Sequence, residues 1–225
     1  MDDPALDVSR HRHALRGLAR LNRWSRSAEI VWDPIERLAQ AVPHRPLRLL
    51  DVATGSGDLP LALWHRAKQR GVSIDCSGCD RSPVAIRYAQ ERARHAVADI
   101  RFFIADALTD LLPAESAYDI VTCSLFLHHL SEADTVRLLR TMHALAGQLV
   151  VVNDLTRSLP GLGLAYLGSH LLTRSSIVHA DGPQSVRAAY TLREIEQLAH
   201  DAGLTQATVV RRWPCRFLLS WRTHG

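Results

Sequence analysis

Long apolar runs are missing from this sequence. No apolar stretch in the 225 residues approaches the roughly 20 that a membrane-spanning helix requires. The chain begins Met1-Asp2-Asp3-Pro4, which is acidic and lacks the apolar segment of a secretory signal. Internal repeats and low-complexity tracts are absent as well. We therefore expect a cytoplasmic protein with no transmembrane segment.

Concentrated positive charge is also scarce, although 27 Lys and Arg residues against 23 Asp and Glu residues give a net charge of +4. The nearest approach to a basic face is Arg12, Arg16, Arg20 and Arg23, which fall at helical spacing. Apolar residues stand between these arginines, a pattern typical of the solvated face of a helix. We therefore expect no nucleic-acid partner, while the sequence leaves a homodimer open.

Cysteine is rare, with four residues in the chain. Cys76 and Cys79 have C-x-x-C spacing, but no second pair and no suitably spaced histidine pair completes a tetrahedral metal site. Both cysteines lie in an apparent strand, where positions three apart point to opposite faces. We therefore expect no bound metal and no redox motif.

What the sequence does contain is a regular alternation of short apolar runs and amphipathic segments. Apolar runs predict strands at 47–53, 72–79, 100–104, 118–124 and 147–153. Helices are predicted at 82–94 and 135–145, and through Leu61 and Ala67 to an end near Gly71. Upstream, helices are predicted over Arg12 to Leu21 and in a segment with Pro34 near its start. This alternation predicts an α/β fold with a doubly wound, mostly parallel sheet.

The alternation breaks after the fifth predicted strand, where residues 155–190 predict a helical lid. Thr191-Leu192-Arg193-Glu194 has the form of a capping box and predicts a helix that ends at Gly203. The strand-like runs 205–213 and 215–222 are joined so tightly that they must be antiparallel. We expect one domain with four parts: a helical cap over 1–45, a core over 46–154, the lid, and a C-terminal helix and strand pair over 191–225.

A glycine-containing turn, residues 50–58, follows the first predicted strand and opens a helix. A dinucleotide site requires G-x-G-x-x-G, but Pro60 stands at the third glycine position. Asp51 and Asp58 would repel a pyrophosphate, whereas they attract the positive amino group and sulfur of S-adenosylmethionine. The local charge therefore favours S-adenosylmethionine over NAD.

Four segments together resemble the class I, Rossmann-like S-adenosylmethionine methyltransferases, in particular the small-molecule branch that includes ubiquinone and menaquinone methylases. They are residues 50–58, where Ala53 stands in place of a common glycine, and residues 78–82, 103–107 and 119–130. The resemblance covers about 47–153 well and the rest by architecture. It implies a seven-stranded sheet whose last strand inserts in reverse, in agreement with the antiparallel pair at the C-terminus.

The resemblance also implies cofactor contacts. Asp80 is implied to accept hydrogen bonds from the ribose hydroxyls, because a carboxylate can accept two at once. Asp106 is implied to receive the adenine amino group. The other residues implied to surround the cofactor are Asp51, Thr54, Gly55, Gly57, Asp58, Arg81, Ala107 and Ser124.

Candidate catalytic groups are His128, His129 and Asp154, which follow the fourth and fifth predicted strands. A phenol or enediol acceptor must lose a proton, for which histidine is suited near neutral pH. In such families these histidines frequently line the pocket instead. The candidate substrate and lid residues are Trp24, Tyr166, His170, His179 and Arg187.

The leading hypothesis is O-methylation of a small aromatic, phenolic, quinol or polyketide-like molecule. C-methylation of a quinone or isoprenoid precursor is the alternative, and an NAD-dependent enzyme on the same fold is the less favoured one. Nucleic-acid methyltransferases that target amino groups carry an (Asp/Asn)-Pro-Pro-aromatic motif, whereas this chain has Ser124-Leu125-Phe126-Leu127 there.

Overall fold

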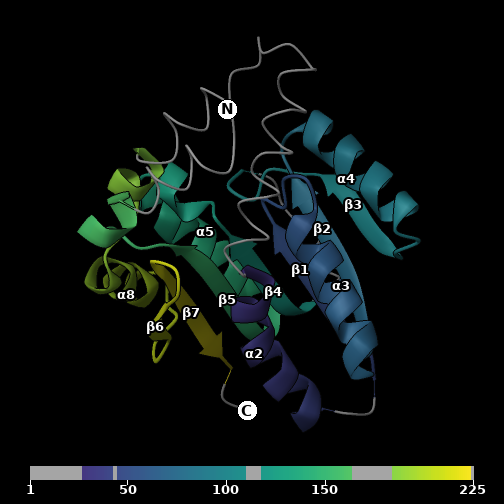
Figure 1. Cartoon of the computed structure of the whole chain (residues 1–225). Coiled ribbons are helices and arrows are strands. Elements are labelled where there is room, and N and C mark those ends of the chain that lie inside the picture. Colours follow the sequence, from purple (N-terminus) through teal and green to yellow (C-terminus); the bar gives the residue numbers. More distant parts are fainter. Residues whose placement is uncertain (1–26, 43–44, 110–117, 164–183, 224–225) are drawn as a thin grey trace.

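The computed structural model describes residues 27–42, 45–109, 118–163 and 184–223. Seven strands form one sheet in the order β3-β2-β1-β4-β5-β7-β6 (Figure 1). Their bounds are β1 Leu47–Val52, β2 Ile74–Asp80, β3 Ile100–Ile104, β4 Tyr118–Ser124, β5 Ala146–Leu155, β6 Thr208–Arg212 and β7 Arg216–Arg222. The first five are parallel, and β7 inserts antiparallel between β5 and β6. The predicted doubly wound sheet with a reversed C-terminal strand is confirmed.

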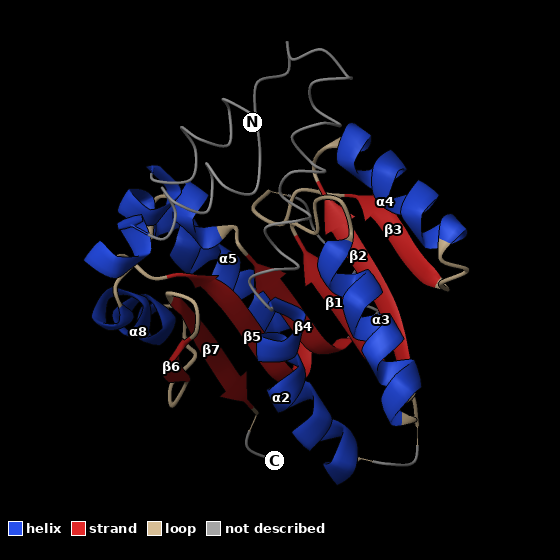
Figure 2. Cartoon of the chain, viewed as in Figure 1, coloured by secondary structure: helices blue, strands red, loops and turns tan. Residues whose placement is uncertain are grey.

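Helices cover both faces of this sheet (Figure 2). One face carries α2 Ser27–Ala41, α3 Asp58–Arg70 and α4 Pro83–His95, and the other carries α5 Glu132–Leu145 and α8 Leu192–Asp201. Alternate strand residues supply the two cores: Leu49 and Val151 pack against α2 and α3, while Leu50 and Val152 pack toward α5 and α8. This alternation follows from the two-residue period of a strand.

Local sequence signals decide where several helices begin and end. Gly71 ends α3 in a left-handed conformation, and the Thr191–Glu194 capping box opens α8 as predicted. The expected start of α2 was wrong, because the helix begins at Ser27 and Pro34 lies inside it. Proline removes one backbone donor, but Val31 before it and Ile35 after it are fully buried against the sheet, and this burial sustains the helix through Pro34.

None of the helices in the described ranges is both long enough and apolar enough to cross a bilayer. The proposed division into cap, core, lid and C-terminal part stays a prediction. Most of the cap and most of the lid lie outside the described residues.

Candidate cofactor site

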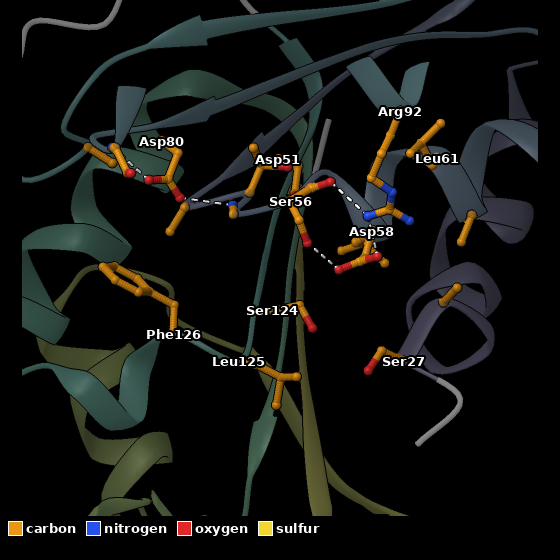
Figure 3. Close-up of a pocket in the computed structure, with 18 of the residues that line it drawn as sticks. Ser27, Asp51, Ser56, Asp58, Leu61, Asp80, Arg92, Ser124, Leu125 and Phe126 are labelled. Carbon is orange, nitrogen blue, oxygen red and sulfur yellow. Dashed lines mark hydrogen bonds and ion pairs between the residues drawn. The ribbon is translucent and has the colours of Figure 1, made fainter. Parts of the chain in front are cut away.

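A cleft with a volume of about 1170 Å³ lies at the carboxyl edge of the parallel strands (Figure 3). The loop after β1, the end of β2, the loop after β3, the end of β4 and the start of α2 all contribute to its lining. Parallel strands place their carboxyl ends at one edge, so segments far apart in the chain meet there. The predicted site residues that line the cleft are Asp51, Thr54, Gly55, Asp58, Asp80, Arg81, Asp106, Ala107, Ser124 and His129.

The loop after β1 is built from backbone conformations that favour glycine. Ala53, Gly55 and Gly57 all have positive φ, at 53°, 55° and 69°. A Cβ at Gly55 would meet no atom within 4 Å, so the backbone there is open to a ligand. Gly57 does not line the cleft, and a Cβ there would lie 2.8 Å from the Phe102 ring. Gly57 is therefore required by φ and packing, and its predicted cofactor contact is not seen in the geometry.

Asp51 lies at the floor of the cleft and is almost fully buried. Burial raises its pKa to about 7, although the Thr122 hydroxyl donates a 2.7 Å hydrogen bond to Oδ1 and opposes this shift. The nearby carboxylates of Asp80 and Asp58 raise the pKa further. A cation placed beside Asp51 would relieve this unfavourable charge, so the floor of the cleft suits a positively charged group.

Asp80 ends β2 and faces the cleft with its carboxylate anchored to the backbone (Figure 3). Oδ2 accepts a 2.8 Å hydrogen bond from the Gly55 amide, and Oδ1 accepts one of the same length from the Ser82 amide. Asp80 is thereby held in place at the cleft, and a carboxylate is a group that can accept both hydroxyls of a diol.

Asp58 is paired within the protein. Its Oδ1 lies 2.5 Å from Nη1 of Arg92, and its Oδ2 accepts a 2.6 Å hydrogen bond from the Ser56 hydroxyl (Figure 3). The same Arg92 nitrogen donates to the Ser56 carbonyl at 2.8 Å. Asp58 lines the cleft, but Arg92 offsets the negative charge that the sequence argument assigned to it. Arg92 thus connects the cofactor loop to α4, which the sequence reasoning missed because the two lie 34 residues apart.

The loop after β3 presents Asp106 and Ala107 to the cleft. Asp106 Oδ1 accepts a 2.9 Å hydrogen bond from the Leu108 amide, and the Ala105 amide donates to the Asp80 carbonyl at 3.1 Å. These bonds fix the end of β3 beside the end of β2. Three aspartates from the ends of three adjacent strands, Asp51, Asp80 and Asp106, therefore line one cleft.

The two predicted catalytic histidines are placed differently, although their rings lie only 4.1 Å apart. His129 lines the cleft, whereas His128 is buried outside it with Nδ1 2.7 Å from Oδ1 of Asp154. His128 and the other nearby donors lower the pKa of Asp154 against the opposing effect of its burial. Asp154 is therefore ionised, and His128 Nδ1 must be the donor.

Asp154 does not line the cleft, and its carboxylate is saturated by the protein. Oδ2 accepts hydrogen bonds from the Phe126 and Leu127 amides at 3.0 and 2.7 Å, and Oδ1 also accepts one from the Leu155 amide at 2.6 Å. These bonds hold η1 Leu127–His129 and the residue before it against the end of β5. The geometry gives Asp154 a positioning role, and its predicted role as proton acceptor stays untested.

The remaining predictions fall on the lid. Trp24, Tyr166, His170 and His179 lie outside the described residues. Arg187 is described, is exposed and does not line the cleft. Leu125 and Phe126 are cleft residues that the predicted site omitted, and Leu125 has a positive φ of 58° that turns the chain out of β4. A left-handed leucine gives no signal in the sequence, because that backbone is unusual for a bulky residue.

Comparison with known proteins decides what kind of cleft this is. Residues 49–147 match the family model described as a methyltransferase domain. This chain carries a class I S-adenosylmethionine methyltransferase domain. The matched segment contains every strand end that supplies Asp51, Asp80 and Asp106, and S-adenosylmethionine is the cofactor of such domains.

Two curated relatives align with this chain over different lengths. The chain is 38% identical over 86 residues to the demethylmenaquinone methyltransferase of Deinococcus radiodurans, which is 38% of this chain and 34% of that protein. It is 28% identical over 206 residues to the ubiquinone biosynthesis O-methyltransferase of Methylococcus capsulatus, covering 84% and 82% of the two chains. The chain thus spans about a third of the length of the first relative.

The fold of the methyltransferase domain recurs in solved structures. An O-methyltransferase family protein from Burkholderia thailandensis superposes with a TM-score of 0.71 at 18% identity, covering 98% of this chain and 61% of that chain. At this identity the likeness concerns the fold alone.

Within the described residues, no three His, Cys, Asp or Glu side chains come together as a metal site, and Cys76 and Cys79 are both buried free thiols.

Proposed function

We propose that this chain transfers a methyl group from S-adenosylmethionine to a small aromatic, phenolic, quinol or polyketide-like acceptor, with O-methylation as the leading reaction. The observation that carries the proposal is the set of three aspartates, Asp51, Asp80 and Asp106, around one cleft beside an open glycine turn. The cleft volume of about 1170 Å³ exceeds that of most small-ligand sites, so a second molecule can enter beside the cofactor.

The residues present fit this cofactor group by group. Asp51, buried at the floor, suits the cationic amino acid end, because a positive partner stabilises its ionised form. Asp80 suits the ribose, since its two oxygens are anchored at the cleft and a carboxylate can accept two hydroxyl hydrogen bonds at once. Asp106 suits the adenine amino group, and Gly55 leaves room for the ligand against the backbone. Thr54, Arg81, Ala107 and Ser124 complete the proposed cofactor wall.

When bound, the cofactor supplies a methyl group already activated by a sulfonium. The protein therefore mainly has to align the acceptor and exclude water, and such positioning supplies roughly 7–11 kcal/mol in favourable cases. Leu125, Phe126 and Leu130 form an apolar part of the lining next to His129. This surface suits an aromatic acceptor, and His129, which lines the cleft beside it, is the proposed acceptor of the hydroxyl proton.

His128 and Asp154 are proposed to hold His129 in position from the side away from the cleft. Asp154 holds His128 through a buried 2.7 Å hydrogen bond and holds the chain before it through two amides. The His128 ring packs against the His129 ring at a tilt of 40° and thereby fixes the position of His129. In this proposal His129 faces the acceptor while His128 and Asp154 are positioning residues.

O-methylation requires loss of a hydroxyl proton, for which His129 is the proposed acceptor, and the longer curated match is to a protein named as an O-methyltransferase. C-methylation of a quinone or isoprenoid precursor remains the alternative, because the Deinococcus relative is named as a demethylmenaquinone methyltransferase. A cytoplasmic location and a homodimer stay predictions from the sequence.

The test has two stages. Calorimetry should show binding of S-adenosylmethionine and S-adenosylhomocysteine, and none of NAD. Binding of NAD alone would refute the proposal and restore the dinucleotide alternative. A labelled-methyl screen against phenols and quinols then identifies the acceptor, and His129→Gln should lower kcat on a phenol while leaving S-adenosylhomocysteine affinity unchanged. His95→Gln, at another part of the cleft lining, is the matched control.

A further inference from the structure

Arg216, the first residue of β7, is a buried cation with two nitrogens that lack hydrogen bonds among the described residues. The residue is only 5% exposed. Neither Nε nor Nη1 makes a hydrogen bond to the part of the chain that the structure describes. Burial lowers its pKa to about 10, so it remains protonated at neutral pH. Burying a guanidinium without hydrogen bonds is strongly unfavourable, which calls for a functional reason.

Asn153 on β5 has a hydrogen-bond acceptor without a donor among the described residues. It is fully buried, its amide nitrogen donates a 2.9 Å hydrogen bond to the Ser124 hydroxyl, and its carbonyl oxygen has no partner among the described residues. In the β5–β7 register Leu155 pairs with Arg216 and Asn153 pairs with Leu218. Asn153 and Arg216 are therefore diagonal neighbours on the same face, within reach for a side chain as long as arginine.

Asp154, the carboxylate that acts on Arg216 among the described residues, makes no hydrogen bond with it there. Asp154 attracts the guanidinium electrostatically, but its oxygens already accept bonds from His128 and from three backbone amides. Strand alternation also places Asp154, paired with Phe217, on the opposite face of the sheet from Arg216. The guanidinium donors are therefore left for another anion.

A row of polar side chains links Arg216 to the cleft. Ser124 lines the cleft and pairs with Asn153 across β4 and β5, and Asp51 pairs with Thr122 on the same face. The row begins at the acidic floor under Asp51 and ends at the cation of Arg216. A positively charged ligand group is favoured at one end and a negatively charged one at the other.

We propose that Arg216, with Asn153 beside it, binds an oxyanion of the acceptor, either a carboxylate or an ionised phenol or enol. This inference rests on the proposed function, because it assigns the second molecule in the cleft. A guanidinium matches the planar pair of oxygens of a carboxylate, and it stabilises a phenolate by the same charge. Arg216 and Asn153 lie behind the cleft lining, which Ser124 forms at this point, so the proposal requires the oxyanion to pass Ser124 while the body of the acceptor stays in the cleft.

The test is calorimetry on protein saturated with S-adenosylhomocysteine, using benzoate and 4-nitrophenolate as anions and benzamide and 4-nitroanisole as neutral analogues. The anions should bind more tightly than their neutral analogues. Arg216→Met should weaken the anions by about 10-fold or more, the usual loss when a hydrogen bond to a charged group is removed. It should leave the neutral analogues and S-adenosylhomocysteine unchanged. Binding of only one of the two anions identifies the chemical source of the oxyanion.

Two variants guard against a purely structural explanation. Arg216→Met should keep or raise the melting temperature, because it removes an unpartnered buried charge. Asn153→Asp places a carboxylate beside Arg216 and should weaken the anions even if Arg216→Met does not fold. Arg211→Met, exposed on β6, is the control that should change nothing.

Equal anion binding by the wild type and both site variants would overturn the inference. A large loss of stability in Arg216→Met with anion binding unchanged in Asn153→Asp would do the same. Failure of S-adenosylhomocysteine to bind would instead count against the proposed function. The anion titrations would then be repeated on the free protein, and their result would test the Arg216 site separately.

Discussion

Asp80 and Asp154 both stand at the end of a parallel strand, and both side chains lie at the same edge of the sheet. Asp80 lines the cleft and accepts two backbone hydrogen bonds, whereas Asp154 is buried and accepts four from His128 and the backbone. The β1–β2–β3 half thus presents carboxylates to a ligand, while the β4–β5–β7 half uses its carboxylate to hold the chain. Removing a cleft carboxylate of the first half should therefore change binding, whereas removing Asp154 should change stability.

The largest effect is expected from Asp154→Ala. It removes the acceptor of several buried donors, so the free energy of unfolding should fall by about 3–5 kcal/mol in a urea titration. The pKa of Asp154 is lowered on folding, so its contribution is present above the ordinary aspartate pKa and is lost as the pH falls. A fully stable variant that had lost only activity would place Asp154 with the ligand-facing carboxylates instead.

Asp80→Ala should show the opposite pattern. Loss of the proposed ribose acceptor should weaken S-adenosylhomocysteine by about 100-fold in calorimetry, which corresponds to two hydrogen bonds to a charged group. The melting temperature should change little, because Asp80 is only half-buried. Asp75→Ala, exposed on the same strand, is the matched control. Unchanged affinity in Asp80→Ala would remove the ribose role.

The raised pKa of Asp51 predicts that cofactor binding in the β1–β2–β3 half depends on pH. If the cationic end of the cofactor meets ionised Asp51, affinity should fall by up to about tenfold per pH unit below 7 and level off above it. The free protein should lose stability as the pH rises from the ordinary aspartate pKa toward 7, because the native state retains a proton that the unfolded state releases. Asp51→Asn should abolish both dependences, and a flat wild-type profile would contradict the assignment.

Arg92→Met tests whether the cofactor loop after β1 depends on its connection to α4. The variant removes the bonds that hold the cofactor loop to α4 through Ser56 and Asp58, so S-adenosylhomocysteine should bind about fivefold more weakly, which is about 1 kcal/mol. Arg87, an exposed arginine on the same helix, provides the control variant Arg87→Met. Equal affinities in the two variants would show that the loop holds its position without Arg92.

The smallest effect is expected from Ala53→Gly. Because Ala53 has a φ of 53°, glycine should raise the free energy of unfolding by about 0.5–1 kcal/mol. Val97 has a φ of 50° at an exposed position away from the cleft lining, so Val97→Gly should give a similar gain. If only Val97→Gly stabilises the protein in urea titrations, the cofactor loop compensates the left-handed conformation in a way the exposed turn does not.

Much of the fold could be predicted from local signals. The strand at 100–104, the strand at 118–124 and the capping box at Thr191 are found as predicted, because each depends on residues close in sequence. The start of α2 could not be predicted, since the burial of Val31 against distant strands outweighs the local preference of Pro34.

The sequence by itself determined the doubly wound sheet and the aspartates after β1, β2 and β3, because strand period and chain order bring these residues to one edge. Only the tertiary structure decided which carboxylates are available. The partners that occupy Asp58 and Asp154, Arg92 and His128, lie 34 and 26 residues away in the chain. The same holds for Arg216, which is one arginine among many in the sequence and becomes a buried cation, with Nε and Nη1 unbonded among the described residues, only when β7 inserts beside β5.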